Sequence, residues 1–184
     1  MTNLQLLHEA REKRALVRIY RSNIERGWIT GWVDAVGLFV VVRVLDDGVR
    51  QNGFICVRVN DVTDFRLPDP EAGFLERVLT ARHVQLPDPL HINPDSAGSL
   101  ISGAKKLFPV VTLHFETFRD TVCYVGEPVA ITEDQVQLKE ISTNGQWDDD
   151  IQWYNLAAVS RVDFGGAYEE ALHLSATFIE PPGR

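Results

Sequence analysis

Two stretches of this chain carry the same pattern of residues, about 95 positions apart. Each stretch opens with strand-like residues, reaches a glycine before a second strand, and later contains a tight-turn signal and a closing set of spaced apolar residues. The matched features are residues 17–20 and 112–115, Gly31 and Gly126, Asp46-Asp47-Gly48 and Asn144-Gly145, and the triplets Val59, Val62, Phe65 and Leu156, Val159, Val162. This period is too long for a solenoid repeat and suits a duplicated small domain.

Each copy is predicted to contain a helix, about five short strands and a second helix. In the first copy an amphipathic helix pattern covers residues 4–15, β-branched runs follow, and a second helix begins near Asp69 and Pro70. The second copy repeats this order from residue 96. Five bent strands in so few residues favour a closed barrel, because closure hides the sheet edges.

Three prolines between residues 86 and 95 indicate an extended connector between the copies. The predicted domains are therefore residues 1–85 and residues 86–184. The chain ends in Pro-Pro-Gly-Arg, which we expect to form a loose tail.

The composition is that of a soluble, folded protein, with 45% apolar and 24% charged residues. The net charge of −8 opposes non-specific attraction to nucleic-acid phosphates, although arginines and lysines cluster between residues 11 and 21. Cys56 and Cys123 lie in apolar strand contexts and are expected to be buried free thiols. The N-terminus lacks a signal-peptide pattern and no apolar run is long enough to span a membrane, so a cytoplasmic location is predicted.

The two copies resemble the Sm-like (Lsm) family of small β-barrels. The first family motif, a glycine followed by apolar residues at fixed offsets, is matched by Gly31, Val33, Val36, Val40, Val42 and Val44. The second motif is similar to residues 57–62 followed by Phe65, and includes Arg58. In the second copy the matching residues are Val129, Val136 and Leu138, then residues 154–159 with Val162. The resemblance implies a mainly β fold of two tandem Sm-like or SH3-like five-stranded barrels with flanking helices.

The polar residues that form the RNA base pocket in this family are largely replaced. The motif's Asp and Asn positions hold Gly37 and Val41 in the first copy, and approximately Glu133 and Gln137 in the second. The Arg position keeps Arg58 in the first copy but holds Asn155 in the second. The resemblance therefore supports the barrel prediction and weakens the RNA-binding role that it would otherwise imply.

No catalytic or metal-binding motif stands out. The histidines lack the i, i+4 spacing of a helical metal site, and Asp148, Asp149 and Asp150 lack the alternating ligands and glycine of a calcium loop. The serines near residue 99 lack a GxSxG frame, and neither cysteine has an evident activating partner. We therefore predict a protein that is not an enzyme and has no metal or other cofactor.

Aromatic residues provide the best candidate binding surface. Trp28 and Trp32 are four positions apart in one predicted strand and therefore share a sheet face. That face is either open to solvent, where Trp and Arg favour partner binding, or covered by a neighbouring helix. The predicted binding residues are Trp28, Trp32, Arg58, Asn60 and Asp61.

The predicted function is a non-enzymatic binding or scaffold protein. Its partner would be another protein or its own copy, because the resemblance implies association edge to edge through the last two strands of each barrel. The segments concerned are residues 54–59, 62–65, 151–156 and 159–164. The alternatives are RNA binding by the barrels and a small-molecule or enzymatic site between them.

Overall fold

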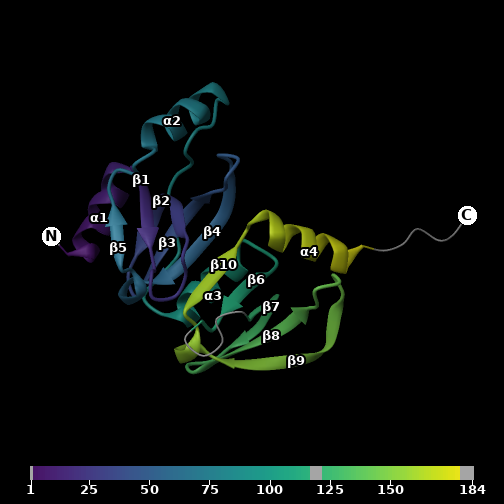
Figure 1. The fold of residues 1–184 in the computed structure, drawn as a ribbon. Coiled ribbons are helices and arrows are strands. Elements are labelled where there is room, and N and C mark those ends of the chain that lie inside the picture. The colour runs from purple at the N-terminus through teal and green to yellow at the C-terminus, as the bar shows by residue number, and fades with distance from the viewer. Residues whose placement is uncertain (1, 117–121, 179–184) are drawn as a thin grey trace, which may run out of the picture.

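The computed structural model describes residues 2–116 and 122–178, whose ten strands form one antiparallel sheet in the order β5-β1-β2-β3-β4-β10-β6-β7-β8-β9 (Figure 1). The first half contains α1 (Asn3–Lys13), β1 (Leu16–Tyr20), β2 (Trp28–Val36), β3 (Phe39–Leu45), β4 (Gln51–Arg58), the 3-10 helix η1 (Val59–Asp61), β5 (Asp64–Arg66) and α2 (Ala72–Ala81). The second half contains α3 (Ala97–Lys105), β6 (Val111–His114), β7 (Cys123–Ile131), β8 (Gln135–Ile141), β9 (Trp147–Asn155), η2 (Leu156–Ala158), β10 (Arg161–Phe164) and α4 (Ala167–Thr177). The predicted C-terminal tail lies outside the described residues.

The mainly β architecture with flanking helices is confirmed, and the order of helix, five strands and helix occurs twice. The two closed barrels are not observed. The sheet is open and continuous from β5 to β9, because β4 of the first half pairs with β10 of the second half. The edge that closure was expected to hide is instead covered by the other half of the same chain.

Two glycines show that the halves are built alike. A Cβ on Gly31 in β2 would lie 2.0 Å from the carbonyl oxygen of Arg43, and a Cβ on Gly126 in β7 would lie 2.2 Å from that of Lys139. Only glycine fits where a strand passes this close to the main chain of its neighbour. The same close approach therefore occurs in each half.

Strand pairing extends this equivalence to the rest of each half. The pairs that establish it are Val17 with Gly31, Ile19 with Phe65, and Arg43 with Phe54 in the first half, and Val111 with Gly126, Leu113 with Val162, and Lys139 with Ile151 in the second. Phe65 in β5 thus corresponds to Val162 in β10. Phe54 in β4 corresponds to Ile151 in β9. Cys56 and Trp153 each lie two residues further along, so they also correspond to each other.

The first helix of each half begins with the same capping arrangement. The side chain of Thr2 accepts a hydrogen bond from the Gln5 N–H, and the side chain of Ser96 accepts one from the Ser99 N–H. Such a box satisfies backbone donors that the first helical turn leaves free. Counting from the two caps, Leu6 of α1 corresponds to Leu100 of α3.

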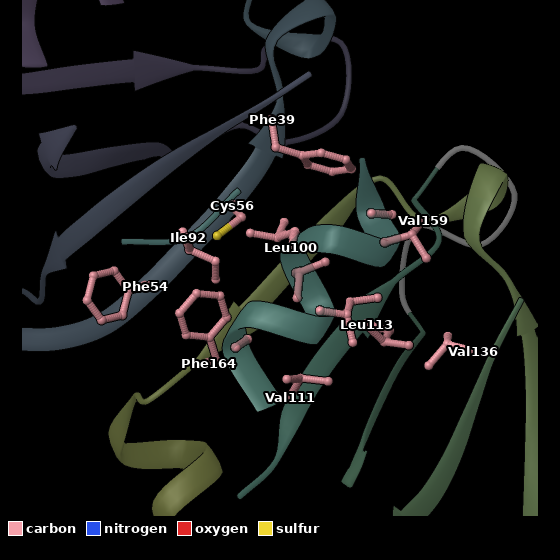
Figure 2. Packing of buried hydrophobic residues seen from close by; sticks show 14 of the residues in the cluster. Phe39, Phe54, Cys56, Ile92, Leu100, Val111, Leu113, Val136, Val159 and Phe164 are labelled. Carbon is pink, nitrogen blue, oxygen red and sulfur yellow. The ribbon is translucent and has the colours of Figure 1, made fainter. Parts of the chain in front are cut away.

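The largest hydrophobic core is shared between the halves. It combines β3 and β4 of the first half with α3 and the strands of the second half (Figure 2). Leu100 of α3 points toward Cys56 of β4, and both residues are fully buried (Figure 2). A second core lies beneath α1 in the first half, and smaller ones lie under α2 and α4. The halves are therefore joined by apolar packing as well as by strand pairing.

The connector between α2 and α3 has no regular secondary structure, as predicted, but it is fastened to the first half. The Phe39 N–H donates to the carbonyl oxygen of Pro94 (2.9 Å), and the Leu90 N–H donates to the carboxylate of Asp34 (2.9 Å). Arg43 also donates to the carbonyl oxygen of Asp88 (3.1 Å). These bonds satisfy backbone groups that a freely swinging linker would leave to water.

Candidate functional site: the joint and the free edges of the sheet

The pairing of β4 with β10, here called the joint, brings together two of the four segments that the sequence analysis assigns to association. Its register pairs Val57 with Arg161, Cys56 with Val162, Ile55 with Asp163, and Phe54 with Phe164. The Arg58 N–H also donates to the Ser160 carbonyl oxygen (3.4 Å). The structure thus places these two segments edge to edge within one chain.

Aromatic packing closes one end of the joint. The rings of Phe54 and Phe164 stack with their centroids 5.2 Å apart, and Phe108 lies 5.3 Å from Phe164. Such ring pairs contribute about 0.5–1.5 kcal/mol beyond the burial of their area. One residue of the cluster comes from the first half and two come from the second, so the rings fasten the halves to each other.

A charged cluster lies on the opposite face of the joint. Asp163 accepts hydrogen bonds from Arg161 Nη2 (2.7 Å) and pairs with His114 Nε2 (3.1 Å). Burial alone would raise the pKa of Asp163, but these two partners outweigh burial and lower it. His114 and Arg161 therefore favour the charged form of Asp163 despite its burial.

A buried ion pair links the halves at the base of the joint. Both nitrogens at the tip of Arg21 donate to the carboxylate of Glu116, at 2.7 and 2.8 Å, and Arg21 also donates to Glu25. Burial would raise the pKa of Glu116, but its bonds to Arg21 and Ser160 lower it instead. Because Arg21 is fully buried, its charge depends on these carboxylates for compensation.

The sheet ends in two edges that no strand of the described residues covers. At one end β9 leaves most of its residues exposed, including Ile151 (44%) and Trp153 (48%). The Leu156 N–H donates to the Asp134 carbonyl oxygen (2.8 Å) beside β8. Because bonding direction alternates along a strand, the main-chain groups of Ile151, Trp153 and Asn155 point away from β8, toward the free edge.

At the other end the main chain of β5 is capped by its own side chains. The Phe65 N–H donates to Asp64 Oδ1 (2.8 Å), and Arg66 Nη1 donates to the Phe65 carbonyl oxygen (3.4 Å). Phe65 therefore directs its hydrogen-bonding groups away from β1, and charged neighbours occupy them in the absence of a partner strand. Charged residues at an edge are a common protection against unspecific strand pairing.

The five predicted binding residues fall into two groups, the two tryptophans in β2 and three neighbouring residues at the end of β4 and in η1. Trp28 is 54% exposed at the start of β2 and Arg18 stacks over its ring at 4.7 Å, whereas Trp32 is 8% exposed and packs under α2. The two rings are not exposed together, because α2 covers one of them. Asn60 and Asp61 form η1, with Asn60 exposed and Asp61 partly buried. Partial burial raises the pKa of Asp61, although the nearby Arg58 opposes this shift.

The positions that the Sm-like resemblance assigns to an RNA base pocket lie in two different surroundings. Pro94 and Asp95 of the connector lie against Gly37. Next to the joint, Arg58, the N-terminus of α3 and residues 131–134 line a cleft of about 530 Å³. Two of these lining residues, Glu133 and Asp134, are acidic. Carboxylates in that position oppose binding of a phosphate backbone.

A smaller hollow of about 220 Å³ lies over the charged face of the joint, where His114, Asp163 and Cys123 converge. A Cys nucleophile needs a thiolate, but neighbouring atoms partly desolvate the Cys123 sulfur and raise the pKa of its thiol, and Asp163 adds to this shift. Cys123 is exposed and Cys56 is buried, so only one of the two cysteines is buried as predicted. Throughout residues 2–116 and 122–178, no group of three or more His, Cys, Asp or Glu residues could hold a metal ion.

Comparisons with protein-family models, with well-characterised proteins and with solved structures find no match for this chain. Within the described residues, no helix is long and apolar enough to cross a membrane. The argument for function therefore depends on the geometry of the joint and the free edges.

Sequence reasoning identified the edge segments but missed two features that act across the halves. The Arg21–Glu116 pair joins residues 95 positions apart, and no local pattern marks such a pair. The correspondence of Leu6 with Leu100 was also missed. The signal that could have found it is the shared cap, Thr2 and Ser96, each four residues before the leucine.

Proposed function

We propose that this chain is a non-enzymatic scaffold that binds protein segments by adding them as strands to its free sheet edges. The observation that carries the proposal is the difference between β4 and β9. They hold the same position in the repeat, yet β4 is covered by β10 and β9 is covered by no described strand. Strand addition to an exposed edge is a recurring mode of peptide recognition, in which main-chain bonds give affinity and side-chain contacts give specificity.

The proposal retains each half as an Sm-like or SH3-like module of five strands that associates through its last two strands. The partner is a protein segment or a second copy of the chain, and the site of action is the cytoplasm. Ile151 and Trp153 supply the apolar contacts at β9, and the outward main-chain groups of Ile151, Trp153 and Asn155 supply the hydrogen bonds. Exposed aromatic residues beside unpaired backbone are well suited to this role, because Trp is enriched among residues that dominate binding energy.

A displayed library of extended peptides tests this function. Trp153→Pro removes an outward N–H and the exposed ring, while leaving the bonds to β8 in place, since proline is tolerated on an edge strand where the N–H faces solvent. Phe74→Ala is the control, because Phe74 is a similarly exposed aromatic residue (53%) but lies in α2. We expect peptides selected on the native protein to lose binding to Trp153→Pro and to keep it with Phe74→Ala. Selection of no peptide, or equal loss with both variants, would contradict strand addition at β9.

A further inference from the structure

We infer that the β9 edge selects extended protein segments of one kind, which run antiparallel to β9, place bulky apolar side chains opposite Trp153 and Ile151, and carry basic residues directly after them. This inference rests on the proposed function and specifies the partner of the same edge. The argument begins with the joint, because β4 and β9 hold the same position in the repeat and β4 shows how an added strand lies against that position.

The joint fixes the register of an added segment. Val162 lies opposite Cys56 in β4, so the same place in an added segment lies opposite Trp153, the counterpart of Cys56. Two residues later the segment lies opposite Ile151, which corresponds to Phe54. Residues directly opposite each other in a sheet point to the same face. Both of these residues of the segment therefore contact the face of β9 that carries Ile151 and Trp153.

That face of β9 presents an apolar pair that the rest of the chain leaves uncovered. Strand β9 lies at the outer end of the sheet (Figure 1), and neither Ile151 nor Trp153 belongs to any of the four apolar clusters that the described residues form. In the joint, the added strand contributes Val162 and Phe164, and both are fully buried. A segment with an aliphatic and an aromatic side chain at these two positions removes the same kind of surface from water.

Three exposed aspartates precede this apolar pair. Asp148, Asp149 and Asp150 occupy a bulge, in which three residues of β9 lie opposite one residue of β8. Within the part of the chain that the structure describes, none of the three forms an ion pair. The ammonium group of Lys139 in β8 lies over the Trp147 ring instead, at 5.0 Å. The charge of the aspartates therefore remains available to a partner.

The negative charge of this bulge acts along β9. Burial and the hydrogen bond to Glu140 raise the pKa of Tyr154, and Asp148 adds to this shift. A segment antiparallel to β9 passes Ile151 before it reaches the bulge, so its next residues lie beside the aspartates. Lysine or arginine is attracted there, whereas an acidic residue or a nucleic-acid phosphate is repelled. The order of the apolar pair and the basic residues therefore reports the direction of the bound segment.

Synthetic peptides test the inference directly. The probe contains Val-Thr-Phe-Lys-Lys between short flanks of glycine and serine, and its matched control contains the same residues in the reverse order. Fluorescence anisotropy of labelled peptides should show binding of the probe at least about tenfold tighter, which corresponds to about 1.4 kcal/mol. A third peptide, with glutamate in place of both lysines, should also bind at least about tenfold more weakly than the probe. Equal binding of the three peptides, or no binding of the probe, would overturn the inference.

Exchange of charge on the protein provides the second test. Asp148→Lys combined with Asp150→Lys should reverse the preference, so that the glutamate peptide binds more tightly than the lysine probe. The control combines Asp47→Lys with Glu76→Lys, which makes the same change in net charge at two exposed residues of the first half, and should keep the preference for lysine. An unchanged preference in the first variant, with both variants folded by circular dichroism, would overturn the inference. Peptides that bind without this preference but are lost in Trp153→Pro would leave the scaffold function standing.

Discussion

Strands β4 and β9 hold the same place in the repeat and have opposite surroundings. Cys56 in β4 is fully buried, whereas its counterpart Trp153 in β9 is about half exposed. The difference lies in the neighbour: β4 is followed in the sheet by β10, and β9 ends the sheet. A strand that is left without a neighbour in a folded chain, and that carries apolar side chains, points to a partner outside that chain.

The largest effect should come from removing an aromatic ring of the joint. Phe164 is fully buried against Phe54 and Phe108, so Phe164→Ala should lower the free energy of unfolding by about 3–5 kcal/mol. The comparison variant is Trp153→Ala at the free edge. This substitution should change the free energy of unfolding by less than about 0.5 kcal/mol in dilute protein. Urea unfolding measures both values. Similar losses in the two variants would show that the free edge is already covered in the monomer.

The next effect comes from the buried ion pair at the base of the joint. Arg21→Met leaves the carboxylate of Glu116 buried without its main partner and should destabilise the protein by about 3 kcal/mol. Adding Glu116→Gln removes the uncompensated charge, so the double variant should be more stable than Arg21→Met alone. Urea unfolding of both variants measures the difference. If the double variant loses the sum of the two single changes, the residues do not act as a pair.

Acid should weaken the joint through the same carboxylates. The pKa values of Glu116 and Asp163 are lower in the folded protein than their ordinary values. Their contribution to stability is therefore complete above the unfolded pKa values of about 4, and is lost as the pH falls through the lower folded values. Urea midpoints measured from about pH 6 down to about pH 2 should fall, and Glu116→Gln should reduce the slope. An unchanged slope would show that Glu116 does not contribute to the pH dependence of stability.

The smallest effect concerns the two thiols. Desolvation of the sulfur, complete for Cys56 and partial for Cys123, raises the pKa of both thiols, so both are expected to be protonated at neutral pH. Cys123, the exposed one, should react in the folded protein and faster as the pH rises, whereas Cys56 should react only after the joint unfolds. Mass spectrometry of timed alkylation distinguishes the two sites. Labelling of Cys56 at the rate of Cys123 would show that the joint opens readily.

Local patterns in the sequence predicted the elements well, and long-range contacts were where prediction failed. Glycine positions, turn signals and apolar periodicity gave the repeated order of helices and strands, because each depends on neighbouring residues. Closure into barrels was predicted from edge protection, but the pairing of β4 with β10 protects that edge in another way. No local sequence signal distinguishes closure of each half into a barrel from pairing of β4 with β10.

The predicted binding residues show the same limit. The alternation in β2 correctly put Trp28 and Trp32 on one face. Which of the two is covered depends on where α2 docks after β5, and that docking depends on contacts across the first half. The prolines of the connector likewise predicted an extended spacer. Its hydrogen bonds to Asp34 and Phe39 could not be predicted, because they depend on residues far away in sequence.

Hydrogen exchange with and without a selected peptide tests the central claim most directly, because it reports the main-chain bonds of the sheet edge itself. Amides of β4 should be protected in both states, because β10 covers that strand. The amide of Trp153 in β9 should exchange rapidly in the free protein and become protected when the peptide is added. If Trp153 exchanges at the same rapid rate with and without peptide, β9 does not take up a further strand.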